Sequence, residues 1–320
     1  MKYYLAPLEG VTGYIFRNTY EEFYGNVDKY FTPFLTPNQT KSFTTKERKD
    51  IAVEHNVGKH VVPQLLTCNA LDFLWAAKEL EQMGYKEVNL NLGCPSKTVV
   101  TKKKGSGFLA YPKELDLFLE EVFSKIQIKL SLKVRLGKDD PEEIFPLIDI
   151  FNKYPLEELI IHPRVQTDYY KNKPKMDVFS KALSLSKNPV CYNGDIFTLE
   201  DYNHFTKAYP QIGNIMLGRG IIANPSLLDQ IKGQTTKPDK DSMLAFHNAL
   251  CEAYEKELSG DRNVLFKMKE IWFYMGTMFV ENKKYEKEVK KSQRVADYKA
   301  AIAAIFNDLE LVDGAGFVAP

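Results

Sequence analysis

Short apolar segments alternate along the chain with longer stretches of helical periodicity. Eight of these segments predict β-strands, because most of them are rich in β-branched or aromatic residues and end at Gly or Pro. They cover residues 3–6, 29–35, 60–66, 87–93, 130–136, 158–164, 189–195 and 214–220. Between them, apolar residues spaced by three and four predict helices over residues 70–83, 112–125, 142–153 and 199–208.

Strands that alternate with helices predict a parallel α/β sheet. Eight such units within about 230 residues match the usual size of a closed (β/α)8 TIM barrel. An open doubly wound sheet is the rival, but it would carry a G-x-G-x-x-G turn after the first strand, and the sequence has none there. We therefore expect a TIM barrel.

The alternation of strand and helix segments ends near residue 241, after the polar Gly/Pro segment 233–238. Helical patterns then cover residues 242–258, 264–278 and about 284–308, and no strand segment follows. We expect a barrel domain at 1–236 and a small helical domain at 241–320. The basic residues between 283 and 294 could bind phosphates or could form a solvated helix face with i,i+4 pairs.

Composition narrows the class of protein further. No stretch approaches the roughly 20 apolar residues of a membrane helix, and the first ten residues contain no long apolar run after a charged start, so we expect no secretory signal. The four cysteines form no C-x-x-C pair, so we expect no metal cluster, no redox dithiol and a reducing cytoplasm. The net charge of +1 leaves a nucleic-acid partner open. Nothing predicts an obligate dimer, and we expect a monomer.

Polar residues gather at the carboxyl ends of the predicted strands, where TIM barrels carry their chemistry. In strand order they are Gln64; Asn91 and Cys94; Lys133 and Arg135; His162 and Arg164; Asn193, Gly194 and Asp195; and Gly218 and Arg219. Taken singly, each has a structural explanation: a paired lysine, a histidine that caps a carbonyl, a turn, or a small buried thiol. Their convergence on one rim predicts a functional site.

The segment Gly218-Arg219-Gly220 predicts an anion site after the last strand. Loops there often bind phosphate through main-chain N–H groups, and a helix is expected from about Pro225. Arg219 could add a charge-assisted contact. The basic loop that holds Lys102 and Lys103 follows Cys94, so we expect it to overhang the site and to meet RNA.

The chain resembles the tRNA-dihydrouridine synthase family. The similarity is carried by Ala6-Pro7-Leu8-Glu9-Gly10-Val11-Thr12 with Phe16-Arg17, Asn91-Leu92-Gly93-Cys94-Pro95, Gly105-Ser106-Gly107, Leu132-Lys133-Val134-Arg135-Leu136-Gly137, His162-Pro163-Arg164, Asn193-Gly194-Asp195 and Met216-Leu217-Gly218-Arg219-Gly220. These motifs cover about three quarters of the chain, in order. Gly13 and the segment after Arg164 depart from the family pattern, which leaves the target uridine open.

The resemblance implies an oxidoreductase that binds FMN, takes electrons from NADPH and reduces a uridine in tRNA, with Cys94 as general acid. It implies that Pro7, Leu8, Glu9, Gln64, Lys133 and His162 hold the isoalloxazine ring. Asn193, Gly194, Asp195, Gly218 and Arg219 would hold the ribityl phosphate end. Asn91, Arg135, Arg164, Lys102 and Lys103 would face the substrate.

Three alternatives stay open at this point. The first is a flavin barrel that acts on a free pyrimidine, similar to dihydroorotate dehydrogenases. The second is a non-catalytic RNA-binding protein on a barrel scaffold. The third is an aldolase in which Lys133 forms a Schiff base.

Overall fold

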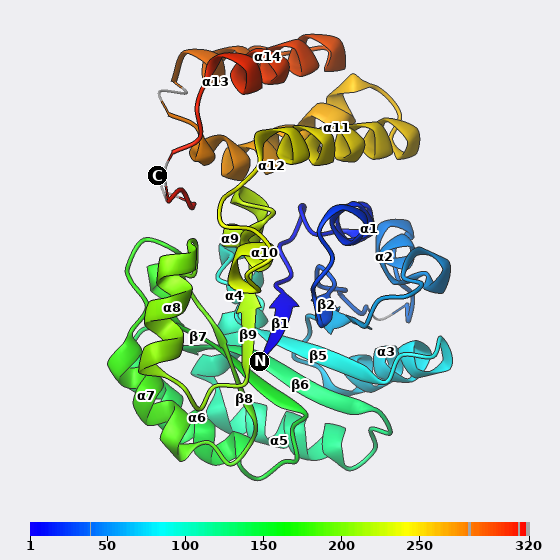
Figure 1. Cartoon of the computed structure of the whole chain (residues 1–320). Helices are drawn as coiled ribbons and strands as arrows, with labels where there is room; N and C mark the ends of the chain where they lie inside the picture. The colour runs from blue at the N-terminus through cyan, green and yellow to red at the C-terminus, as the bar shows by residue number, and fades with distance from the viewer. Residues whose placement is uncertain (39, 281–282, 313, 318–320) are drawn as a thin grey trace. The chain divides into compact units, whose positions relative to one another are not determined.

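The computed structural model describes residues 1–38, 40–280, 283–312 and 314–317 (Figure 1). Its contacts divide the chain into two compact units. Unit 1 holds Met1–Pro7, Lys29–Gly194 and Gln211–Met216. Unit 2 holds Leu8–Asp28, Asp195–Pro210 and Leu217–Pro320. Each unit is described by itself.

The strands form one sheet in which the paired strands run parallel, in the order β3-β2-β1-β9-β8-β7-β6-β5-β4. Their bounds are β1 Lys2–Leu5, β2 Lys29–Phe31, β3 Val61–Val62, β4 Gln64–Leu65, β5 Glu87–Leu92, β6 Lys129–Gly137, β7 Glu158–Val165, β8 Val190–Asn193 and β9 Asn214–Leu217. The two strands at the ends of this order, β3 and β4, are halves of one segment interrupted at Pro63, which has no N–H to donate. The sheet therefore closes on itself, and the predicted TIM barrel is confirmed.

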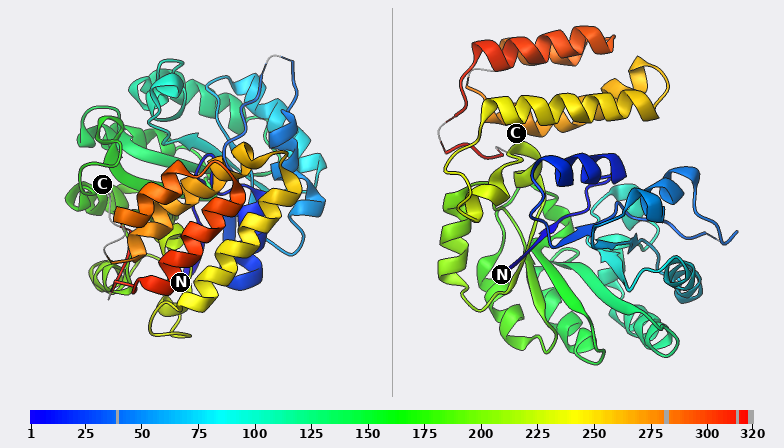
Figure 2. Two further views of the ribbon diagram at one scale, coloured as in Figure 1. Left: turned by 90° about the horizontal axis from the view of Figure 1, so that it is seen from above. Right: turned by 45° about the vertical axis from the view of Figure 1, so that its right-hand side comes forward.

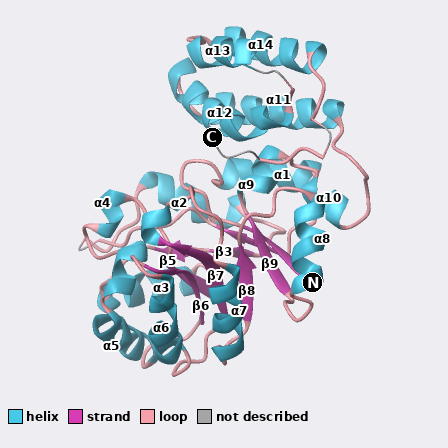
Figure 3. Cartoon of the chain, turned by 90° about the vertical axis from the view of Figure 1, so that its left-hand side faces the viewer, coloured by secondary structure: helices cyan, strands magenta, loops and turns pink. Residues whose placement is uncertain are grey.

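Helices and turns follow the strands of unit 1, and Figure 3 shows several of these helices around the strands. They are α2 Thr45–Ile51, η1 Val53–His55, α3 Ala70–Gln82, α4 Lys97–Val100, η2 Gly105–Ala110, α5 Pro112–Phe123, η3 Pro141–Glu143, α6 Ile144–Phe151, η4 Gln166–Asp168 and α7 Met176–Leu185. The helix α3 begins after Asn69, whose side chain accepts a hydrogen bond from the main chain of Asp72, and it buries Phe73 and Leu80. Pro112 opens α5 as predicted.

Unit 2 is largely helical. It contains α1 Tyr14–Phe23, α8 Leu199–Ala208, α9 Arg219–Ala223, α10 Leu227–Ile231, α11 Lys240–Glu257, α12 Asp261–Met275, η5 Gly276–Met278, α13 Lys283–Lys291 and α14 Val295–Asp308. The last four α-helices lie side by side (Figures 1 and 2). Phe246 of α11 packs edge-on against Phe16 and Tyr20 of α1, with ring centroids 6.0 and 6.2 Å apart.

The single helix predicted over residues 284–308 is wrong, because the structure has α13 and α14 with a break between them. The Lys269 ammonium donates to the carbonyls of Lys290 and Ser292. These carbonyls therefore have hydrogen-bond donors without a continued helix, and α13 can end there. The main-chain N–H of Val295, at the start of α14, donates to Asp261. Long-range contacts of this kind leave no local signal in the sequence.

The contacts group residues 8–28 and 195–210 with the C-terminal helices. The domain boundary expected between residues 236 and 241 stays a prediction. Among the described residues, no helix is both long and apolar enough to cross a membrane. The same residues contain no cluster of three or more His, Cys, Asp or Glu arranged to hold a metal ion.

Candidate active site

Cys94 follows β5 and is held through its main chain on both sides. The Asn91 Oδ1 accepts hydrogen bonds from the main-chain N–H groups of Gly93 and Cys94, at 3.0 and 2.9 Å. The Cys94 carbonyl accepts from the Ser106 hydroxyl at 2.7 Å and from its N–H at 3.1 Å. A Cβ on Gly105 would lie 2.8 Å from that carbonyl, so this turn requires glycine. The sequence thus fixes the backbone that carries the partly exposed thiol.

A buried chain of polar side chains extends from Asn91 through the barrel interior. The Asn91 amide donates to Gln64 at 2.7 Å, and Gln64 donates to Asn89 at 2.8 Å. The chain continues from Asn89 to the Ser131 hydroxyl at 2.9 Å, from Ser131 to Glu87 at 2.7 Å, and ends in the Lys29–Glu87 ion pair at 2.7 Å. Every member has a partner, as a buried polar network requires.

Sequence reasoning missed four members of this network: Lys29, Glu87, Asn89 and Ser131. A signal was present, because β5 reads Glu-Val-Asn-Leu-Asn-Leu and places a polar residue at every second position. That period gives a strand one polar face. In a closed barrel whose outer face packs on helices, the polar face points inward.

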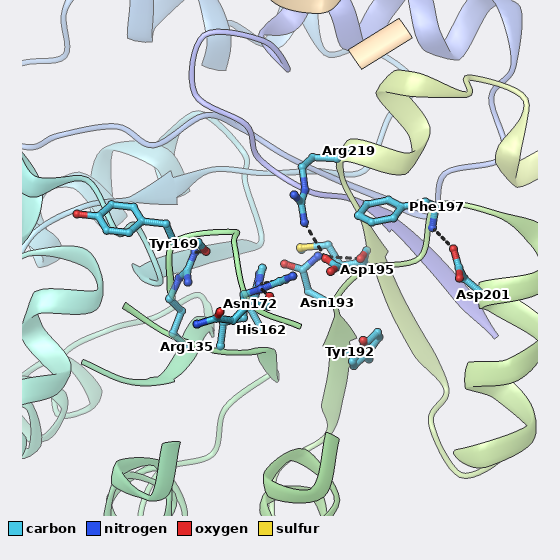
Figure 4. Close-up of polar contacts among 12 residues, drawn as sticks. Arg135, His162, Tyr169, Asn172, Tyr192, Asn193, Asp195, Phe197, Asp201 and Arg219 are labelled. Atoms are coloured by element: carbon cyan, nitrogen blue, oxygen red, sulfur yellow. Dashed lines mark hydrogen bonds and ion pairs between the residues drawn. The ribbon is translucent and has the colours of Figure 1, made fainter. Parts of the chain in front are cut away.

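Arg135 holds together the loops that follow β5 and β7. Its guanidinium donates to the carbonyls of Gly93 at 2.9 Å, Val165 at 2.8 Å and Tyr169 at 2.8 Å. Figure 4 shows Arg135 with Tyr169. The side chain is 1% exposed. Burial is the main cause that lowers the pKa of Arg135 from its usual value. These contacts fix the main chain next to Cys94.

His162 and Arg164 lie together at the end of β7. The Arg164 guanidinium lies 3.0 Å from the His162 Nε2 and donates to the Asn172 carbonyl at 2.6 Å. Asp168 accepts from the Val165 N–H at 3.1 Å, and it also accepts from the Asn172 amide. Figure 4 shows His162, Asn172 and Tyr169 around this turn. The structure therefore brings these two predicted residues together.

Lys133 lies next to Asn91 across the β5–β6 ladder and is only partly exposed. Burial lowers its pKa to about 8, and the Arg135 charge adds to the effect. No hydrogen bond or ion pair of its ammonium group occurs within the described part of the chain. A recessed cation without a protein partner is suited to an anionic or carbonyl-rich ligand, which fits the electron-rich edge of a flavin.

The predicted residues at the ends of β8 and β9 are divided between the two units. In unit 1, Asn193 donates to the Met216 carbonyl at 2.8 Å, and a Cβ on Gly194 would lie 1.9 Å from the Tyr192 hydroxyl. In unit 2, Arg219 pairs with Asp195 at 2.7 Å (Figure 4). α9 begins at Arg219 itself, directly after Gly218.

The predicted segment after β1 forms a tight turn. Pro7 ends the first part of unit 1, and in unit 2 the Leu8 carbonyl accepts from the main-chain N–H of Thr12 at 3.0 Å. Glu9 is exposed, and the Gly10 carbonyl accepts from the Lys267 ammonium at 2.6 Å. α12 therefore fixes this turn within unit 2.

The two predicted RNA contacts in the loop after Cys94 differ in their surroundings. Lys103 pairs with Glu114 at 3.1 Å and lies over the Tyr111 ring at 4.1 Å. Lys102 is exposed, and its carbonyl accepts a weak hydrogen bond from the Cys68 thiol at 3.7 Å. Lys102 thus presents its charge to solvent while Lys103 is engaged.

Comparisons with known proteins point to the same family as the sequence motifs. The family model for dihydrouridine synthase (Dus) matches residues 4–310. The tRNA-dihydrouridine synthase B of Pasteurella multocida (strain Pm70) is 27% identical over 225 residues, which cover 70% of this chain and 67% of that protein. The tRNA-dihydrouridine(16) synthase of Pseudomonas syringae pv. tomato (strain ATCC BAA-871 / DC3000) is 26% identical over 249 residues, which cover 74% and 78%. Among solved structures, a variant of NCR from Zymomonas mobilis has a TM-score of 0.51 at 16% identity, with 77% and 90% covered, a likeness in fold alone.

Proposed function

The chain belongs to the dihydrouridine synthase family, and on this premise we propose that it reduces a uridine of tRNA to 5,6-dihydrouridine. Family membership makes it a flavin-dependent oxidoreductase and favours this reading over the free-pyrimidine, non-catalytic and aldolase alternatives. We further propose FMN as the flavin and NADPH as the reductant. The observation that carries the proposal is Cys94, fixed by Asn91, which lies beside a Lys133 whose ammonium group has no partner among the described residues.

Bound FMN, once reduced by NADPH, would supply the hydride that carbon 6 of the uracil ring needs. The thiol of Cys94 would donate the proton that carbon 5 needs, from the opposite face. General acid catalysis of this kind contributes about 10²–10⁴-fold, and it requires a protonated thiol at a fixed position. Asn91 and Ser106 supply the fixed position, because they hold the Cys94 main chain from both sides.

We propose that Gln64, Lys133 and His162, with the main chain of Pro7, Leu8 and Glu9, hold the isoalloxazine ring. The Lys133 ammonium would stabilise negative charge there, as electrostatic preorganisation requires. The phosphate end is assigned to Asn193, Gly194, Asp195, Gly218 and Arg219. A guanidinium is the side chain best suited to bind phosphate with two parallel hydrogen bonds.

On the substrate side we propose Asn91, Arg164, Lys102 and Lys103. Arg135 belongs with them chiefly as a positioning residue, since three of its donors bind main-chain carbonyls. A uridine stacked in folded tRNA must leave its stack to reach such a site, at a cost of a few kcal/mol. Exposed lysines such as Lys102 would offset part of that cost by binding phosphates. A cytoplasmic location and a monomeric state stay predictions from the sequence.

The test is a comparison of Cys94→Ala with wild type. We expect the variant to bind FMN with unchanged affinity and to accept electrons from NADPH at a normal rate. We expect it to form dihydrouridine in unmodified tRNA at least about 100-fold more slowly, from the usual contribution of a general acid. Cys68→Ala is the matched control, because Cys68 is another partly exposed cysteine, and it should keep full activity. Full activity of Cys94→Ala would refute the assigned role.

A further inference from the structure

The last described residues of the chain return to the segment after β8 within unit 2. Ala315 is 9% exposed and Phe317 is 5% exposed. A Cβ on Gly316 would lie 2.4 Å from the Phe197 carbonyl oxygen, so the main chains of the two segments touch at this point. The tail is therefore packed into the unit through residues that carry no charge.

Phe317 forms one wall of an aromatic corner around Arg219. The Arg219 Cζ lies 5.1 Å from the Phe197 ring and 5.2 Å from the Phe317 ring. The two rings lie 5.4 Å apart at an interplanar angle of 70°. Because these three distances are nearly equal, the rings meet the guanidinium from adjoining sides and do not sandwich it.

The position of Phe317 is itself fixed by α12. Its ring lies 5.3 Å from the Tyr274 ring and 6.2 Å from the Phe273 ring. Arg219 is held at another point by Asp195, through the 2.7 Å ion pair (Figure 4). The guanidinium therefore has an ion pair and two aromatic contacts, which together restrain its orientation.

We propose that Phe317 is a positioning residue for Arg219, so that the C-terminal tail forms part of the site for the terminal phosphate of the cofactor. The inference rests on the proposed function, which assigns Arg219 to that phosphate. A guanidinium binds phosphate through a planar pair of N–H groups, so its plane must be set before the ligand arrives. Without the Phe317 ring, binding would have to order the arginine side chain, at a cost in affinity.

The experiment measures the affinity of the flavin-free full chain for FMN and for riboflavin, by quenching of flavin fluorescence. The two ligands differ only in the phosphate. We expect Phe317→Leu, which keeps an apolar side chain but removes the ring, to weaken FMN binding by about three- to tenfold, the usual cost of ordering one long side chain on binding. Riboflavin binding should not change. Phe317→Tyr, which keeps the ring, should bind FMN as wild type does.

Two further variants separate positioning from general packing. Arg219→Ala should reduce FMN affinity to near that of riboflavin, and Phe317→Leu should then have no further effect on FMN. Phe266→Ala is the control, since Phe266 is a 68% exposed aromatic residue of α12, the helix that holds Phe317. It should leave both affinities unchanged.

Equal weakening of both ligands by Phe317→Leu, or no weakening of either, would overturn the inference. Additive losses in the double variant would overturn it as well. If wild type itself binds FMN no more tightly than riboflavin, the assignment of Arg219 to phosphate fails, and the inference fails with it. If wild type prefers FMN and Phe317→Leu keeps that preference unchanged, the inference about Phe317 fails while the assignment of Arg219 to phosphate stands.

Discussion

Replacement of Arg135 by lysine tests how the backbone next to Cys94 is held. The guanidinium donates to three main-chain carbonyls, of Gly93, Val165 and Tyr169. A lysine ammonium is a point donor on a flexible stem and can reach one of these carbonyls at most. Arg135→Lys therefore removes two charge-assisted hydrogen bonds, each worth about 1.5–3 kcal/mol. The free energy of unfolding should fall by about 3–6 kcal/mol.

Thermal unfolding gives the first measurement. With an unfolding entropy of about 2.1 cal/mol/K per residue over 320 residues, this loss corresponds to a fall in Tm of about 4–9 °C. Arg294→Lys is the matched control, because Arg294 is exposed and pairs with Asp297 on a helix surface. Its Tm should change by less than about 1 °C, since surface pairs contribute little.

Alkylation of Cys94, located by peptide mass spectrometry, gives the second measurement. The released Gly93 carbonyl should let the loop open more often, so that Cys94 of Arg135→Lys reacts about tenfold faster than in wild type. A variant with wild-type Tm and wild-type Cys94 reactivity would refute the structural role given to Arg135.

Three further predictions follow from single contacts. Burial raises the pKa of Glu158 to about 7, and its Oε2 has no hydrogen-bond partner within the described residues, so the folded state keeps a proton that the unfolded state loses above about pH 4.5. Between pH 4.5 and 7, the free energy of unfolding of wild type should therefore fall by up to about 3 kcal/mol, and that of Glu158→Gln should not show this fall. Denaturant titrations of both proteins at several pH values measure the difference, and identical pH dependence would mean that the carboxyl is ionised throughout. Gly105→Ala should cost about 1–2 kcal/mol more than Gly58→Ala, because both glycines have positive φ but only the Gly105 Cβ would lie 2.8 Å from a main-chain atom, the Cys94 carbonyl oxygen; equal losses in chemical denaturation would exclude that contact. Because the pKa of Lys133 is about 8, its ammonium loses its charge as the pH rises through 8, and flavin affinity of wild type should fall over that range. The affinity of Lys133→Met should stay constant, and a fall shared by both proteins would assign the titration to another group.

The barrel could be predicted from the sequence because its strands carry their own signals. All eight predicted strand segments overlap observed strands, and most of their apolar runs end at Gly or Pro. Helix α1 was not predicted, although Phe16 and Tyr20 of its buried face have helical spacing. Its burial against α11 depends on residues far along the chain.

The candidate site could be predicted only as a set of residue types. Strand ends and the family resemblance point to Cys94 and Lys133. The hydrogen-bond pattern of Arg135 depends on how the loop after β7 folds back, and one residue of that loop, Tyr169, has a φ of +50°. Phe317 stands in a C-terminal segment that resembles no motif, so its contact with Arg219 could come only from three-dimensional structure.

The most direct test is mass-spectrometric mapping of unmodified tRNA after incubation with the enzyme, FMN and NADPH, beside a Cys94→Ala reaction run in parallel. We predict a gain of two hydrogens at one uridine with wild type and almost none with Cys94→Ala. No gain at any uridine of a full tRNA pool, with FMN bound and reduced, would contradict the proposed reaction.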